Sequence, residues 1–179
     1  MMFLSRKSKL RLAACSLVLL SANLAFAQRR ETGPVEFSMR SVDGQTVTAD
    51  SLRGEVVVLA FGASWLPLSR AQLQGLRKLA DEYSARGVVV YFVSTESNDS
   101  KSKNYASDQQ LRAFADKFGL KVTVLRDPEG QISKKLGIDQ LPSIIILDKQ
   151  GNVVDEPIRG LDPQGNLAGQ LASRLDKIL

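Results

Sequence analysis

The chain has 179 residues and carries 24 lysines and arginines against 19 aspartates and glutamates, with one cysteine and no histidine. This length is enough for one domain with a buried core and short for two. Without histidine there is no Ser-His-Asp or Cys-His catalytic centre and no imidazole metal ligand, and one cysteine makes neither an intrachain disulfide nor a thiolate zinc site. Carboxyl groups, hydroxyls, backbone groups or binding alone must therefore carry the function.

Residues 1–27 have the features of a secretory signal peptide. They contain no acidic residue, start with a basic cluster, continue from Leu12 as an apolar run and end in a small-x-small site at residues 25–27. This order predicts cleavage before Gln28 and a periplasmic or secreted protein that meets a membrane only during export. The apolar run is also too short, and too interrupted by polar residues, for a membrane span of about 20 residues.

An alternative in the same segment is lipidation of Cys15. Residues 12–15 match the short motif that precedes a lipidated cysteine in bacterial lipoproteins. Such a motif closes the apolar run, whereas here the run continues to Ala27, which favours cleavage before Gln28. An N-terminus at a modified Cys15 in the mass spectrum of the exported protein would contradict this prediction.

Cleavage at this site changes both the charge and the thiol content. It removes four of the 24 basic residues and leaves 20 against the same 19 acidic residues, so the formal net charge falls from +5 to +1. A near-neutral mature chain does not favour a nucleic acid or an acidic membrane as a partner, because both require a clustered basic face. Cys15 is removed as well, and the mature chain has no thiol.

The mature chain begins with residues 28–34, which we expect to be a flexible N-terminus ahead of one domain over residues 35–179. An extended segment at Val35–Met39, a turn at Asp43 and Gly44 and a short strand at Thr46–Thr48 predict an N-terminal hairpin. The continuous apolar run that follows, Glu55–Phe61, is typical of a central strand covered on both faces.

Helical and extended patterns then alternate. Apolar residues at helical spacing predict a helix over Leu68–Ala85 that ends at Gly87, followed by a second buried strand at Val88–Val93. A capping box at Ser107–Gln110 predicts the start of the next helix, and a short strand follows at Val122–Leu125.

The last third of the chain contains two predicted helices and a hairpin. Asp127 and Pro128 predict the start of a helix that runs to Leu136. Ser143–Asp148 is a buried strand, joined by a turn to an edge strand from Val153. Asp162 and Pro163 predict the cap of a terminal helix with leucines four residues apart. The class is α/β, with a mixed sheet of about five strands flanked by helices on both faces.

The segment Leu59–Arg70 resembles the active-site signature of thioredoxin-like proteins, and residues 33–179 resemble the exported TlpA/ResA-type thiol-disulfide oxidoreductases, which are related to the redoxin and peroxiredoxin domains. The hairpin before the first central strand, the long insertion after the second, and Gly137–Pro142 before a buried strand all lie where that family has them. The resemblance implies a thioredoxin-like fold with an N-terminal β-hairpin extension, and a cis-proline at Pro142 that faces the active site.

The reactive groups of the family are absent. Its motif is Trp-Cys-x-x-Cys at the start of the first long helix, where the helix dipole and the free amides lower the pKa of a thiol. Here Leu66 stands at the nucleophilic position and Ser69 at the resolving position, and neither forms an exchangeable bond to sulfur. Many relatives also carry a buried Asp or Asn where this chain has Ala60. We therefore expect no disulfide exchange, no peroxidase activity and no catalytic residue.

A binding groove is the function that this scaffold retains. The family pairs extended substrate segments with the backbone beside the cis-proline, and this contact needs no cysteine. The alternative is structural: Leu66 caps the core, Trp65 packs under it, and Ser69 caps the helix or faces solvent. The candidate groove residues are Trp65, Leu66, Pro67, Leu68, Arg70, Leu141 and Pro142.

The polar stretch Thr95–Ser107 reads as a surface loop, ordered or mobile. A partner site with Tyr105 as its anchor and a solvated insertion are the two interpretations. The acidic residues do not repeat at the spacing of a carboxylate metal loop or a glycosidase pair, so we expect no metal and no cofactor.

The sequence thus predicts an exported, redox-inactive binding or accessory module whose partner is a protein or an extended peptide segment. An alternative is a non-catalytic subunit of a thiol-disulfide oxidoreductase or cytochrome c maturation system that acts with a thiol-active partner. A third alternative is a purely structural or chaperone-like surface.

Overall fold

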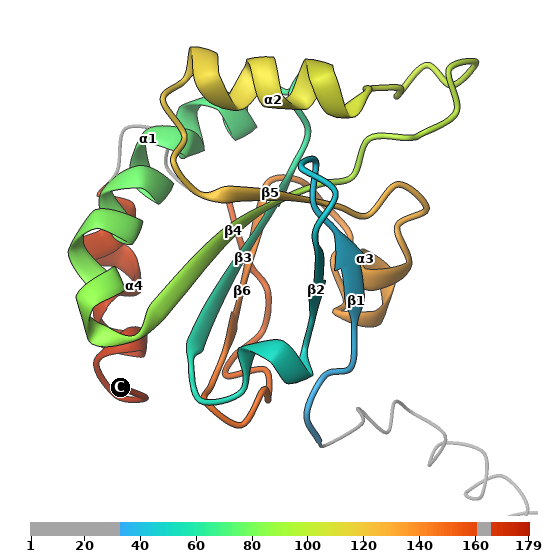
Figure 1. Cartoon of the computed structure of the whole chain (residues 1–179). Coiled ribbons are helices and arrows are strands. Elements are labelled where there is room, and N and C mark those ends of the chain that lie inside the picture. Colours follow the sequence, from blue (N-terminus) through green and yellow to red (C-terminus); the bar gives the residue numbers. More distant parts are fainter. Residues whose placement is uncertain (1–32, 161–165) are drawn as a thin grey trace, which may run out of the picture. The chain divides into compact units, whose positions relative to one another are not determined.

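The computed structural model describes residues 33–160 and 166–179 (Figure 1). The predicted signal peptide, Cys15 and the predicted cap at Asp162 and Pro163 lie outside these residues. The strands are β1 (Ser38–Arg40), β2 (Thr46–Thr48), β3 (Val56–Gly62), β4 (Val88–Ser94), β5 (Thr123–Arg126), β6 (Ser143–Leu147) and β7 (Ile158–Arg159). The helices are α1 (Pro67–Tyr83), α2 (Asp108–Lys117), α3 (Gln131–Lys135) and α4 (Leu167–Leu175), with 3-10 turns η1 (Asp50–Leu52) and η2 (Ser84–Arg86).

A mixed sheet of five strands forms the centre, in the order β5-β4-β3-β6-β7. Strands β3, β4 and β5 are parallel, whereas β6 runs antiparallel to β3 and β7 antiparallel to β6. All seven residues of β3 are buried, because the strand has neighbours on both edges and packed layers on both faces. The predicted α/β class and the central position of the Glu55–Phe61 run are confirmed.

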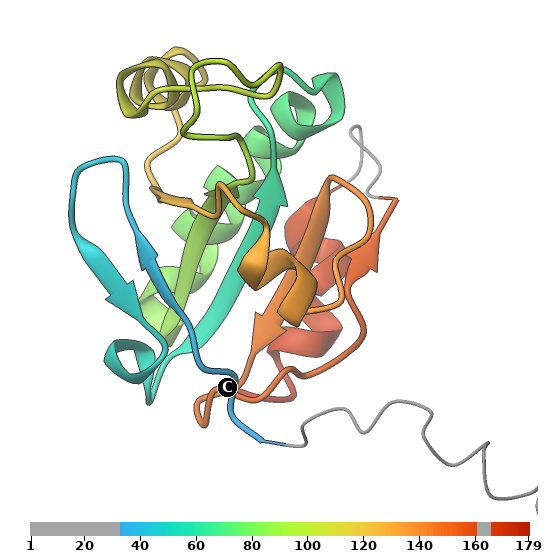
Figure 2. The same cartoon turned by 90° about the vertical axis from the view of Figure 1, so that its right-hand side faces the viewer.

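The side chains of β3 alternate between two cores. Val58 and Ala60 point into the larger core, which α1, α2 and α4 complete. Val57, Leu59 and Phe61 point into the smaller core, which the N-terminal hairpin and α3 complete. Figure 2 shows this division, with the hairpin and α3 in front of the sheet and α1 and α4 behind it.

The N-terminal hairpin is a separate two-stranded sheet of β1 and β2. Its turn includes Gly44, whose φ of 88° is a conformation that favours glycine. Next to the turn, the amide of Val42 donates to the carbonyl of Val124 at 2.9 Å, so the hairpin attaches to the outer edge of β5. The predicted hairpin extension is therefore confirmed, and it covers part of an otherwise open sheet edge.

Two helix starts compare directly with the sequence prediction. The capping box of α2 is confirmed, because the Ser107 hydroxyl accepts from the Gln110 amide and the Gln110 side chain accepts from the Ser107 amide. The predicted start of α3 at Asp127 and Pro128 is wrong, since these residues form a turn and the helix begins at Gln131 after Gly130. The Asp127 carboxyl group still accepts from the first helical amides, so it binds the helix start from a distance.

The hairpin predicted after β6 is confirmed, but its edge strand is not continuous from Val153. After the turn that follows β6, Val153 forms only an isolated bridge with Leu147. Regular pairing resumes at β7, where Ile158 lies opposite Ile144. Pro157 lies between the two pairings, and proline has no N–H for a strand ladder.

The terminal helix α4 packs through the predicted leucines. Leu167, Leu171 and Leu175 are buried against the larger core, and Leu179 follows the helix and is partly buried. None of the helices within residues 33–160 and 166–179 is both long enough and apolar enough to cross a membrane.

Candidate functional site

The loop between β3 and α1 carries the predicted site, at the carboxyl end of the central strand. The helix begins at Pro67, whose fixed φ and missing N–H suit the first helical position. Leu66 is the N-cap, with extended φ and ψ of −80° and 119°, and it is half-buried. A leucine side chain accepts no hydrogen bond, so the first turn of α1 has no side-chain cap.

Ser69 lies under this loop and not at the surface. It is fully buried, and its hydroxyl accepts from the amide of Ala63 at 3.2 Å. A Cβ atom at Gly62 would lie 2.7 Å from this hydroxyl oxygen, so the close packing requires glycine there. The interpretation of Ser69 as a helix cap or a solvent-exposed residue is therefore wrong: the side chain closes the strand-to-helix turn.

A buried carboxyl group holds the same loop from the neighbouring strand. Glu96 is 1% exposed and accepts from the Ser64 amide at 3.0 Å, the Ser64 hydroxyl at 2.6 Å and the Ser94 hydroxyl at 3.0 Å. The sequence predicts only that Glu96 belongs to the polar loop Thr95–Ser107, and this role of its carboxyl group is not predicted. A signal was available, because Glu96 is the second residue after β4 and the carboxyl ends of the parallel strands β3 and β4 meet at one edge of the sheet.

The apolar side chains of the loop remain accessible. The exposed fraction is 55% for Trp65 and 47% for Leu68, and Pro67 is exposed as well. The alternative in which Trp65 packs under Leu66 is therefore wrong. The Trp65 indole N–H donates to the side-chain oxygen of Asn104 at 2.7 Å, a contact that sequence reasoning did not find.

Arg70, one of the candidate groove residues, is exposed and hydrogen-bonds to the loop. Its guanidinium donates to the carbonyl of Ser64 at 2.7 Å. Ala60, the position at which many relatives carry an acid or an amide, lies in β3 and is fully buried, and its methyl side chain has no polar group. The site therefore contains neither of the cysteines nor the buried acid or amide of the family motif.

The predicted cis-proline lies beside this loop. The peptide bond between Leu141 and Pro142 is cis, and Pro142 is buried. The next residue, Ser143, is the register partner of Phe61 near the end of β3. Leu141 is half-buried, and within residues 33–160 and 166–179 its backbone N–H and C=O have no hydrogen-bond partner. The fold thus places an open backbone segment next to the loop that carries Trp65.

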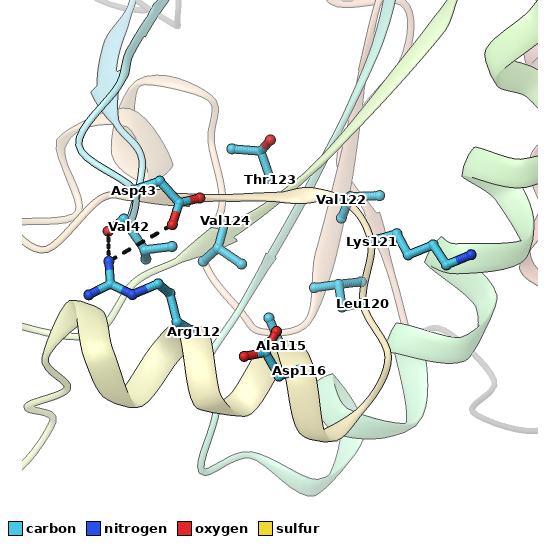
Figure 3. A pocket seen from close by; sticks show the side chains of 10 residues that line it. All are labelled: Val42, Asp43, Arg112, Ala115, Asp116, Leu120, Lys121, Val122, Thr123 and Val124. Atoms are coloured by element: carbon cyan, nitrogen blue, oxygen red, sulfur yellow. Dashed lines mark hydrogen bonds and ion pairs between the residues drawn. The ribbon is translucent and has the colours of Figure 1, made fainter.

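A separate hollow of about 250 Å³ lies elsewhere, between the hairpin turn, α2 and β5 (Figure 3). Arg112 crosses its mouth, donating to the carbonyl of Val42 and lying 3.9 Å from the carboxyl group of Asp43. None of the predicted groove residues lines this hollow. In the described part of the chain, no three His, Cys, Asp or Glu side chains come together as a metal site.

A comparison with protein-family models shows which family the chain belongs to. The model of the AhpC/TSA family matches residues 33–156. The chain belongs to the AhpC/TSA family. The chain is 30% identical to the thioredoxin-like protein YneN of Bacillus subtilis (strain 168) over 122 residues. These aligned residues are 67% of this chain and 66% of YneN.

Two further proteins are similar, one by sequence and one by structure, and the first agrees with the predicted TlpA/ResA-type resemblance. The thiol-disulfide oxidoreductase ResA of Bacillus anthracis is 26% identical over 135 residues, which cover 75% of this chain and 72% of ResA. The exposed lipoprotein thioredoxin Etrx1 of Streptococcus pneumoniae has a structure that matches 80% of this chain and 99% of its own, with a TM-score of 0.64 and 24% identity. The thioredoxin-like fold is confirmed.

Proposed function

We propose that the protein is an exported, redox-inactive member of this family that binds an extended segment of another polypeptide. Disulfide exchange and thiol-dependent peroxide reduction both begin with a thiolate, and Leu66 and Ser69 supply none. The hydroxyl of Ser69 is buried and engaged with Ala63, and the chain contains no histidine to activate it. Binding is the activity left to this site.

The observation that carries the proposal is the open backbone of Leu141. Leu141 lies two residues before β6, and among the described residues its N–H and C=O have no partner. Such groups can pair with an extended segment by strand addition, in which main-chain hydrogen bonds supply affinity. Burial of an unpaired peptide group is unfavourable. A half-buried residue whose N–H and C=O lack partners therefore gains when a second chain supplies hydrogen bonds to them.

The apolar side chains beside Leu141 indicate what such a segment presents. Trp65 and Leu68 are two of the few large apolar side chains that are exposed within residues 33–160 and 166–179. Buried tryptophans contribute much of the energy of known interfaces, and extended segments place alternate side chains on one face. We expect the partner to offer apolar side chains at every second position.

Export is part of the proposal. The order of basic, apolar and small residues over residues 1–27 supports it, and Etrx1, a protein of the same fold, is an exposed lipoprotein. In a compartment with a thiol-active oxidoreductase, the bound segment can belong to that enzyme, and the protein then acts as its non-catalytic subunit.

The test uses a short, tryptophan-free peptide of alternating valine and threonine that carries a fluorescein label. Fluorescence anisotropy should show binding to the mature protein. The double substitution Trp65→Ala, Leu66→Ser should weaken binding at least about tenfold, or ~1.4 kcal/mol. The control is Val153→Ser, which changes an exposed apolar residue outside the site and should leave affinity unchanged. Equal affinity of the double variant and the wild type would refute the proposed surface.

A further inference from the structure

The polar insertion Thr95–Ser107 is attached to the sheet at both of its ends. The guanidinium of Arg126, a β5 residue whose side chain is 3% exposed, donates to the carbonyls of Glu96 at 3.1 Å and Ala106 at 2.9 Å. The same group donates to the carboxyl group of Asp108 at 2.6 Å, just after the loop. Both ends of the loop are therefore hydrogen-bonded to the buried guanidinium of Arg126, which fixes the position of the loop on the sheet.

One residue of this loop reaches the candidate site. Asn104 accepts the indole N–H of Trp65 at 2.7 Å, and its side-chain amide donates to the carbonyl of Thr95 at 3.1 Å. Its backbone carbonyl accepts from the amide of Ser97 at 2.6 Å. Asn104 is thus fixed within its own loop and offers one oriented acceptor to the indole.

We propose that Asn104 is a positioning residue for Trp65, so that the insertion Thr95–Ser107 forms part of the peptide-binding surface. This inference rests on the proposed function. More than half of the Trp65 side chain is exposed, and an exposed side chain must be immobilised when a partner packs on it. The bond from Asn104 restricts the indole in the free protein, and the partner then meets a ring that is already oriented.

Tyr105, the residue after Asn104, is an exposed aromatic residue of the insertion. Its side chain is 37% exposed, and its backbone forms a bridge with Ser97 that holds it beside Asn104. Tryptophan and tyrosine supply large contact areas with few rotatable bonds. In this proposal an extended polypeptide pairs its backbone with Leu141 and places apolar side chains against the rings of Trp65 and Tyr105.

Trp65 is the only tryptophan of the chain, so intrinsic fluorescence reports on this contact directly. The substitution Asn104→Ala should increase the quenching of Trp65 by acrylamide and lower its fluorescence anisotropy in the free protein. Asn104→Asp, which keeps an acceptor oxygen, should restore part of the wild-type signal. The control is Asn98→Ala: its side-chain oxygen accepts from Arg126 at 2.6 Å in the same loop, and the indole should not respond.

The labelled valine–threonine peptide provides the second measurement. Asn104→Ala should weaken peptide binding about fivefold, the effect of one hydrogen bond, while Asn98→Ala leaves it unchanged. Unchanged affinity of Asn104→Ala, or unchanged quenching of Trp65, would overturn the positioning role. If the wild type fails to bind the peptide, the proposed function is refuted as well as the binding part of this inference, and the quenching measurement alone decides whether Asn104 orients the indole.

Discussion

The two ends of the central sheet are held in different ways. At the carboxyl end of β3, the loop with Trp65 is bound by Ser69, Glu96 and Asn104, which lie up to 39 residues away in sequence from the groups they hold. At the opposite end, the side chain that closes the turn after β6 belongs to the turn itself: the Asp148 carboxyl group accepts from the amides of Gln150 at 2.9 Å and Asn152 at 2.8 Å. Distant residues bind there to backbone carbonyls of the turn, as where the Gly54 amide donates to the carbonyl of Lys149 at 2.9 Å.

This difference explains how a family scaffold keeps the shape of its site without the reactive residues. A turn whose closing side chain is its own depends on that side chain for its local shape. A loop held by distant groups has its geometry set by the surrounding fold, so substitutions within the loop leave its path unchanged. Leu66 and Ser69 stand at the two cysteine positions of the family motif, and the loop around them is still bound at the start of a regular helix.

The largest effect is expected from Glu96→Ala. This substitution leaves the amide and hydroxyl of Ser64 and the hydroxyl of Ser94 without their acceptor in a buried place. We expect the free energy of unfolding to fall by about 2–3 kcal/mol, measured by urea denaturation.

The matched control for this prediction is Asp99→Ala, an exposed acidic residue of the following loop. Its effect should stay within about 0.5 kcal/mol. If both variants are equally stable, the loop does not depend on Glu96, and the contrast between the two ends of the sheet fails.

A smaller effect of opposite sign is expected from Gln72→Leu. Gln72 lies one turn after Ser69 in α1, is 6% exposed, and neither polar atom of its amide has a hydrogen-bond partner within the described residues. Replacing an unpaired buried amide by an apolar group of similar size should raise the free energy of unfolding by about 1 kcal/mol. Gln74→Leu on the exposed face of the same helix is the control and should change little. A loss of stability in Gln72→Leu would contradict this prediction, because it would mean that the side-chain amide of Gln72 stabilises the folded protein.

The smallest effect concerns Asp148 and depends on pH. Burial opposes ionisation of this carboxyl group, but hydrogen bonds from Asn152, Gln150 and Gly151 outweigh it and hold the pKa of Asp148 below its usual value. A lowered folded-state pKa stabilises the protein above the unfolded-state pKa of about 3.9, and this contribution disappears as the pH falls through the folded-state value.

Asp148→Ala should therefore reduce the stability by at most about 1 kcal/mol at neutral pH. The difference from the wild type should shrink below about pH 4, as measured by thermal unfolding across a pH series. A difference that grows toward acidic pH would contradict the sign of the pKa shift.

The contrast between local and long-range contacts also separates the features that the sequence predicts from those that it does not. The central strands, the capping box at Ser107 and the hairpin at Asp43 follow from local patterns of burial, capping and turn residues, and the structure confirms them. The start of α3 and the strand after Val153 differ because a glycine and a proline interrupt patterns that read as continuous.

The candidate site is predictable only in part, for the same reason. The positions of Leu66 and Ser69 and the cis peptide at Pro142 follow from the family motif. Glu96 and Asn104 act on residues more than thirty positions away, and no local pattern places a side chain against so distant a partner. Such contacts depend on which strands lie side by side, which only the folded chain shows.

The central claim is that the site keeps the geometry of the family and lacks its reactive groups. The most direct test is the reduction of insulin disulfides with dithiothreitol as donor, which becomes its own disulfide as each insulin disulfide becomes two thiols. We expect no rate above background for the mature wild-type protein and a measurable rate for the double substitution Leu66→Cys, Ser69→Cys. Turnover by the wild type, or a silent double variant that folds normally, would contradict this account.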